Sequence, residues 1–228
     1  MSEAPPRQLF YGRRRGRPLR AGQRERQTTL LPRLSFELPE SGPLHPAELF
    51  TPPAREVWLE IGFGGGEHLA GQAARRPDVL VLGVEPFLNG VASLLRHVDQ
   101  QSLANVRILE GDARELVGRL PAASLARVFV LFPDPWPKTR HRKRRLMQAG
   151  FVGALARATR PGGRLRFATD WRDYAAWTLS RMLASPDWSW TAERASDWRQ
   201  PPDDHLTTRY ERKALGDTAP IFLEFVRR

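Results

Sequence analysis

Four acidic residues stand at or just beyond the ends of short apolar stretches, where a carboxylate is well placed to bind a ligand. They are Glu60, Glu85, Asp112 and Asp134. A carboxylate accepts hydrogen bonds from hydroxyl and amino groups, so such a set can bind the ribose and the base of a nucleoside. Taken singly, each acid could equally be a helix cap or a loop residue. Because the acids follow successive stretches, together they favour a nucleoside site.

A glycine-rich loop follows the first of these stretches, with glycine at Gly62, Gly64 and Gly66. Glycine lets the backbone turn tightly and approach a cofactor closely. The dinucleotide fingerprint is G-x-G-x-x-G, but Glu67 occupies the place of its last glycine. Glu60 and Glu67 would repel a pyrophosphate, whereas they suit the cationic sulfonium and ammonium groups of S-adenosylmethionine. We therefore expect the three glycines to bind this cofactor; a bare strand-to-helix turn is the alternative.

The segment at residues 132–138, F-P-D-P-W-P-K, joins a carboxylate, an aromatic ring and a cation. Its three prolines restrict the backbone and would hold Asp134 in one place. Proline-rich loops also occur for purely structural reasons. A basic run follows directly, and we expect its side chains to bind the phosphates of a nucleic acid together with Lys138. The run comprises Arg140, Arg142, Lys143, Arg144 and Arg145.

Alternating apolar and amphipathic segments predict the elements that would bring these residues together. Strands are expected at residues 57–61, 79–84, 106–109, 128–132 and 165–168. Helices are expected at residues 67–75, 88–101, 146–159 and 171–183. This alternation indicates an α/β, Rossmann-like, doubly wound and mostly parallel sheet, in which ligands bind beyond the carboxyl ends of the strands. Late strands at residues 188–191 and 221–226 predict an antiparallel edge, with a short helix at residues 209–215 between them.

The positive charge of the chain is concentrated in two short segments. The net charge is +11, from 36 basic and 25 acidic residues. Residues 1–30 hold eight Arg and two Glu, and residues 136–145 hold six Lys or Arg and no acid. Each segment therefore carries +6, and the rest of the chain carries −1. Clustered positive charge attracts phosphate backbones, although a merely solvated surface is the alternative. We expect a flexible, RNA-binding arm at residues 1–30 and one folded domain at residues 31–228.

The composition also excludes several classes of site. The chain has no cysteine, so it has no thiolate nucleophile and no cysteine-ligated metal. Its five histidines are scattered, and we expect no metal site. We expect a cytoplasmic protein with no membrane partner, because no apolar run approaches membrane-spanning length. An arginine-rich start is also typical of a mitochondrial transit peptide, but the prolines and glycines of residues 1–30 disfavour an amphipathic helix.

The motif F-P-D-P-W-P-K followed by R-H-x-K-R-R resembles the bacterial tRNA (guanine-N7-)-methyltransferases, whose target is the variable-loop guanine conventionally numbered 46. The resemblance covers nearly the whole chain from about Phe10, where residues 10–16 look like the family's N-terminal arm. It implies a Rossmann-like methyltransferase domain that binds S-adenosylmethionine and tRNA. It places the cofactor-contacting acids on Glu60, Glu85, Asp112 and Asp134. It places substrate-contacting residues on Lys138, Asp170, Thr208, Arg209, Tyr210 and Glu211.

Two questions stay open at the level of sequence. Thr208 and Glu211 also fit a capping box, in which each side chain binds the other's backbone amide. An exocyclic base amine is an alternative methyl acceptor, and an RNA-binding module with a vestigial nucleoside site is the non-enzymatic alternative.

Guanine N7 carries a free lone pair, so its methylation needs no general base. We expect Asp134 to be the catalytic residue, either by stabilising the positive charge on the ring or by holding the guanine.

Overall fold

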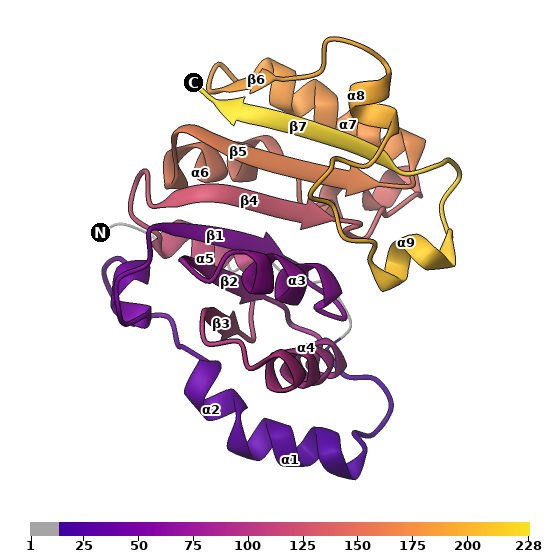
Figure 1. The fold of residues 1–228 in the computed structure, drawn as a ribbon. Coiled ribbons are helices and arrows are strands. Elements are labelled where there is room, and N and C mark those ends of the chain that lie inside the picture. The colour runs from indigo at the N-terminus through magenta and orange to yellow at the C-terminus, as the bar shows by residue number, and fades with distance from the viewer. Residues whose placement is uncertain (1–13) are drawn as a thin grey trace.

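A computed structural model describes residues 14–228 and shows one seven-stranded sheet between two layers of helices (Figure 1). The strand order in the sheet is β3-β2-β1-β4-β5-β7-β6. The strands are β1 (Glu56–Ile61), β2 (Val79–Val84), β3 (Val106–Leu109), β4 (Leu125–Leu131), β5 (Thr159–Thr169), β6 (Trp188–Trp190) and β7 (Ile221–Arg227). The first five strands run parallel to one another, and β7 runs antiparallel to both β5 and β6. The predicted fold class and its antiparallel edge are confirmed.

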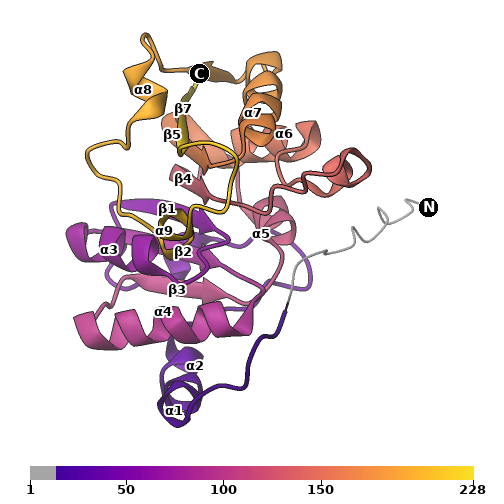
Figure 2. The same ribbon diagram turned by 90° about the vertical axis from the view of Figure 1, so that its right-hand side faces the viewer.

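Helices cover the two faces of the sheet in separate groups (Figures 1 and 2). One face carries α3 (Glu67–Arg75) and α4 (Leu88–Gln101), whose apolar residues share a core cluster with β2 and β3. The other face carries α5 (Ala113–Arg119), α6 (Ala149–Ala158) and α7 (Arg172–Ala184). Every residue of β2 is buried, as expected for a parallel strand between two helical layers. The remaining helices are α1 (Ala21–Thr29), α2 (Leu31–Leu34), α8 (Ser196–Arg199), α9 (Arg209–Lys213) and the short 3-10 helices η1 (Pro46–Leu49) and η2 (Thr139–Arg144).

Several predicted boundaries need correction. The strand expected at residues 165–168 is longer, because β5 continues through Pro161-Gly162-Gly163. Its pairing with β4 shifts there, and Gly162 has a φ of 75°, so these residues form a bulge within the strand. The helix expected at residues 146–159 begins later, at Ala149, because η2 and a short loop precede it. Helix α5 was not predicted.

The prediction of a flexible arm at residues 1–30 is wrong for residues 21–29, which form α1 against α4. Arg26 binds Asp99 of α4 at 2.7 Å. The preceding segment is held at the start of α4, where the Asn89 amide accepts from the Gly16 N–H at 2.8 Å and donates to the Arg17 carbonyl at 2.7 Å. The sequence predicts no helix here, because the prolines and glycines of residues 1–30 disfavour one. Residues 1–13 lie outside the described residues, and so does most of the motif at residues 10–16.

Alanine substitutions at two glycines, one in α4 and a control in α6, test how closely α4 packs against the loop after β1. A Cβ added at Gly90 in α4 would lie 2.4 Å from the carbonyl oxygen of Gly64, whereas a Cβ at Gly153 in α6 would meet nothing within 4 Å. We predict that Gly90→Ala lowers the free energy of unfolding by about 1–3 kcal/mol, because the helix must shift. Gly153→Ala should raise it by about 0.5–1 kcal/mol. Urea denaturation of both variants checks the pair, and two equal effects would contradict this packing.

Candidate active site

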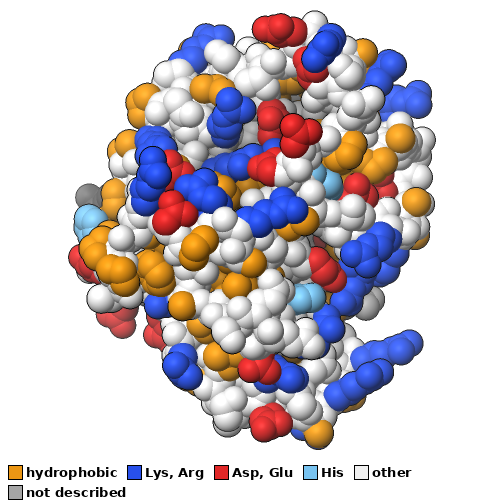
Figure 3. Space-filling view, viewed as in Figure 1, with side chains coloured by type: hydrophobic (Ala, Val, Ile, Leu, Met, Phe, Trp, Pro, Cys, Tyr) orange, Lys and Arg blue, Asp and Glu red, His pale blue; other side chains and the backbone are white. Residues whose placement is uncertain are grey.

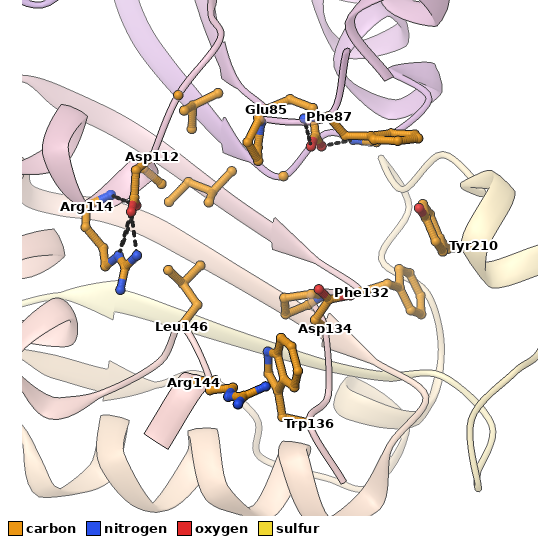
Figure 4. A pocket seen from close by; sticks show the side chains of 18 residues that line it. Glu85, Phe87, Asp112, Arg114, Phe132, Asp134, Trp136, Arg144, Leu146 and Tyr210 are labelled. Atoms are coloured by element: carbon orange, nitrogen blue, oxygen red, sulfur yellow. Dashed lines mark hydrogen bonds and ion pairs between the residues drawn. The ribbon is translucent and has the colours of Figure 1, made fainter. Parts of the chain in front are cut away.

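A pocket of about 400 Å³ opens beyond the carboxyl ends of β1, β2 and β4. Three of the four predicted acids, Glu85, Asp112 and Asp134, line it together (Figure 4). They are separated in sequence but follow β2, β3 and β4, which run parallel in one sheet, so their carboxyl ends bring the three acids to one edge. The lining also includes side chains that were not predicted as site residues, namely Phe87, Arg114, Trp136 and Leu146.

The glycine loop has a backbone that requires its glycines. Gly62, Gly64 and Gly66 have φ angles of 68°, 53° and 79°, in the left-handed region that favours glycine. Gly62 and Gly64 line the pocket. Gly66 caps α3 and packs on Leu94 of α4. The G-x-G-x-G spacing thus follows from three left-handed residues in five, and its last glycine serves packing against α4.

Glu85 connects the glycine loop to the start of α4. Its Oε2 accepts from the Gly64 N–H at 2.8 Å, and its Oε1 accepts from the Phe87 N–H at 2.9 Å. Burial raises the pKa of the Glu85 carboxyl, against the lowering effect of these two amides. Each carboxylate oxygen has a further lone pair, so Glu85 retains the capacity to accept from ligand hydroxyls.

Asp112 has two roles in the structure. Its Oδ1 accepts from the Arg114 N–H at 2.9 Å and caps α5, and its carboxylate also binds the Arg114 guanidinium. The capping alternative is therefore correct at this position. Asp112 and Arg114 also both line the pocket, so the cap places the carboxylate at the ligand's edge.

Glu60 lies away from the pocket lining, although the sequence predicts a cofactor contact. It is buried, and its Oε2 binds His68 Nδ1 of α3 at 2.7 Å. His68 contacts Gln72, whose amide donates to the Asp204 carbonyl at 2.8 Å. Glu60 therefore belongs to a buried polar network that connects β1 and α3 to the segment before α9.

The proline-rich loop carries Asp134 into the pocket. Phe132 and Trp136 have φ angles of 50° and 44°, which are unfavourable for residues with side chains. The sharp turns at these two positions flank Asp134. The surrounding pocket walls raise the pKa of the Asp134 carboxyl by withdrawing it from water. Asp134 nevertheless stays exposed at the mouth of the pocket, so a ligand can reach its carboxylate, and a cationic or hydrogen-bonding ligand would stabilise its charge.

Helix α9 contributes Tyr210 to one side of the pocket (Figure 4). The capping box predicted for Thr208 and Glu211 is confirmed, with reciprocal bonds of 3.2 and 3.3 Å. Glu211 also binds His205 at 2.8 Å. Tyr210 lies over Gly64 and lines the pocket, and Arg209 pairs with Glu67 of α3 at 3.3 Å.

Asp170 holds the segment that follows α9. Its Oδ2 accepts from the Gly216 N–H at 2.8 Å, and its backbone carbonyl accepts from two further amides of this segment. Asp170 is 9% exposed and is not among the residues that line the pocket. Its observed contacts are therefore with the chain itself.

The basic run divides into exposed and buried side chains. Lys138, Arg140 and Lys143 are exposed. The Arg144 guanidinium lies 4.9 Å from the centre of the Trp136 ring, and Arg142 binds Asp173 of α7 at 2.9 Å. The prediction that every cation of the run contacts phosphate needs correction at Arg145, whose side chain is 1% exposed.

The described residues contain no group of three His, Cys, Asp or Glu side chains that could hold a metal ion. Within residues 14–228, no helix is long and apolar enough to cross a membrane.

Comparison with known proteins places this arrangement in a class. Residues 54–223 match a family model described as "Putative methyltransferase". The fold is similar to that of the 16S rRNA (adenine(1408)-N(1))-methyltransferase from Catenulisporales acidiphilia, with a TM-score of 0.50, 18% identity and coverage of 76% of this chain and 88% of that one. It is also similar to TrmN from Thermus thermophilus, with a TM-score of 0.53, 16% identity and coverage of 77% and 45%. The fold and the strand-end pocket define a Rossmann-like methyltransferase.

Closer relatives identify the family within this class. The chain is 56% identical to the tRNA (guanine-N(7)-)-methyltransferase of Caulobacter sp. (strain K31), over 95% of this chain and 94% of the relative. It is 50% identical to the enzyme of the same name from Nitrobacter hamburgensis, over 90% and 80%. The chain belongs to the tRNA (guanine-N(7)-)-methyltransferase family, and the resemblance seen in its motifs is confirmed.

Glu85, which follows β2, and Glu110, which follows β3, offer a matched test of the pocket. We predict that Glu85→Ala weakens S-adenosylmethionine binding by about 1–3 kcal/mol, because the variant lacks a buried hydrogen-bond acceptor and leaves two amides unpaired. Glu110→Ala removes an exposed acid next to the pocket but outside its lining, and it should change affinity little. Calorimetric titration measures both. Equal affinities for Glu85→Ala and wild type would show that Glu85 does not face the cofactor.

Proposed function

We propose that this protein transfers a methyl group from S-adenosylmethionine to N7 of a guanine in tRNA, at the variable-loop position conventionally numbered 46. The observation that carries this proposal is the meeting of Glu85, Asp112 and Asp134 in one pocket, next to an exposed basic segment. The names of the close relatives support the same reaction. Since tRNA is the proposed substrate, we place the protein in the cytoplasm.

The pocket fits the cofactor in size and in chemistry. Its volume of about 400 Å³ falls within the range of small-molecule sites. Glu85 would bind the ribose hydroxyls, because its carboxylate is fixed by two backbone amides at the end of β2. Asp112 would accept from the adenine amino group, while Gly62 and Gly64 allow close approach of the backbone. When bound, S-adenosylmethionine supplies a methyl group activated by a positively charged sulfur.

The residues around the base need only position it and stabilise charge. Guanine N7 carries its lone pair at neutral pH, so no residue has to remove a proton before the attack. Positioning of this kind accounts for a large part of enzymatic rate enhancement. Positive charge appears on the purine as the methyl group arrives, and the Asp134 carboxylate would stabilise it or hold the base through N1–H and the amino group. Tyr210 lines the same pocket from α9 and would contact the substrate there.

The exposed cations would hold the RNA around the pocket. Lys138, Arg140 and Lys143 lie at the end of the proline-rich loop. On the face shown in Figure 3, further Lys and Arg side chains gather where α9 and the segment that enters α1 lie. Contacts with phosphates fix the orientation of a nucleic acid but do not read its sequence. In this proposal Thr208, Glu211 and Asp170 act by fixing the segment that carries Arg209 and Tyr210.

Mapping the methylated atom tests the proposed function directly. Unmodified tRNA is incubated with the protein and methyl-labelled S-adenosylmethionine, and the labelled nucleoside is identified by mass spectrometry. We expect 7-methylguanosine at the variable-loop position. A label on an exocyclic amine would replace the proposal by the alternative reaction, and binding of tRNA without label transfer would favour a non-enzymatic RNA-binding module.

The pKa of Asp134 gives the reaction a predictable pH dependence. Because the pocket raises this pKa, the carboxylate becomes protonated at a higher pH than an ordinary aspartate, whose pKa is about 3.9. The ionised form is the one that stabilises a cation, so kcat/KM should fall as the pH is lowered through the raised value. Asp134→Asn should reduce turnover strongly and remove the acid limb measured at saturating S-adenosylmethionine, where protonation of Glu85, whose pKa is also raised, no longer limits cofactor binding. A variant with full activity and an unchanged profile would rule out the charge-stabilising role.

A further inference from the structure

We propose that Arg145 is a positioning residue for the Asp134 loop, although it stands at the end of a run whose other cations face the solvent or the pocket. This inference rests on the role proposed above for Asp134. It gives the basic run two functions, since one arginine acts inside the protein while exposed neighbours act on RNA.

The contacts of Arg145 join the proline-rich loop to α7. Its Nε donates to the carbonyl oxygen of Pro135 at 2.9 Å, and its Nη2 binds the carboxylate of Asp173 in the first turn of α7. Its guanidinium lies 4.8 Å from the centre of the Tyr174 ring and 5.2 Å from that of Trp177. The guanidinium is therefore fixed in position by α7 and bonded to the loop.

The Pro135 carbonyl is an effective point at which to fix Asp134. Pro135 directly follows Asp134, and the two neighbouring turns at Phe132 and Trp136 have left-handed backbones. Such conformations persist only where surrounding contacts enforce them. A hydrogen bond from a buried, charged donor is strong enough to do so. The residue after Arg145 belongs to the same assembly, because Leu146 lines the pocket and its N–H donates to the Tyr174 hydroxyl at 3.2 Å.

The Arg145 side chain is buried and is therefore not available to contact an RNA ligand. Its side chain is 1% exposed, whereas Lys143, two residues earlier, is exposed. A phosphate cannot reach the buried Arg145 guanidinium unless the surrounding side chains move. The two cations should therefore have different kinetic signatures, which a comparison of their variants can separate.

Arg145→Lys is the informative substitution, because it keeps the charge but loses the planar fork and the stacking geometry. We expect kcat to fall by about 10- to 100-fold, since a small displacement of a reacting group has effects of this size. The KM for tRNA and the slope of log affinity against log salt should stay close to wild type. Lys143→Gln should instead raise the KM for tRNA and flatten the slope by about one unit.

A double-mutant cycle distinguishes positioning of Asp134 from a general loss of structure. In an Asp134→Ala background there is no carboxylate left to position, so Arg145→Lys should lower the single-turnover rate by no more than about twofold. Arg166→Lys is the matched control. Arg166 is also a buried arginine, at 2% exposure, but its carboxylate partners are Asp204 and Glu224. Its effect should be the same in both backgrounds.

Three results would overturn the inference. One is an equal loss from Arg145→Lys in the wild-type and Asp134→Ala backgrounds, and another is wild-type kcat for Arg145→Lys. The third is a flattened salt dependence for Arg145→Lys, which would make Arg145 an RNA contact. If the lysine variant does not fold, Asp173→Asn weakens the ion pairs of both Arg145 and Arg142. The part of its effect on kcat that acts through Arg145 should be lost in the Asp134→Ala background. Absence of methyl transfer by the wild-type protein would instead refute the proposed function.

Discussion

The buried carboxylate of Glu85 is the interaction on which the geometry of the pocket depends. It accepts one amide from the glycine loop and one from the start of α4, so it joins the two turns that form the pocket floor. An ionised carboxylate with little access to water requires such donors. Gly64, one of the two donors, lies beneath Tyr210 and against Gly90 of α4. A shift of this loop would therefore move the helix that follows β2 as well as the side chain that covers the pocket.

Short-range sequence patterns were sufficient to predict most of the sheet. The bounds expected for β2 and α4 agree with the structure, because a continuous apolar run and a long amphipathic period are both local signals. Helix α5 was missed because it has only seven residues and includes a glycine. The full length of β5 depends on its pairing with β4 and β7. This pairing is between residues distant in sequence, so a local pattern does not predict it. Helix α1 was missed because its stability depends on packing against α4.

The candidate site shows the same division between local and distant information. Glu85, Asp112 and Asp134 could be predicted because strand ends in a parallel sheet converge. Glu60 and Arg145 could not be distinguished from their neighbours, since the partners that bury them come from other elements. Arg145 meets Asp173, 28 residues later, and the network of Glu60 extends through Gln72 to Asp204, 132 residues after Gln72. From residue type alone, Glu60 and Arg145 would both be predicted to bind a ligand. Their contacts show that each side chain instead holds a loop near the pocket.

The central claim is that the strand ends form one pocket in which Glu85 and Asp112 hold the cofactor next to Asp134. A crystal structure of the protein with the reaction product S-adenosylhomocysteine tests this most directly. Our account predicts that the ribose hydroxyls bind the Glu85 carboxylate, that the adenine lies beside Asp112, and that the sulfur faces Asp134 and Tyr210. Product bound elsewhere, or in this pocket with its ribose away from Glu85, would contradict the account.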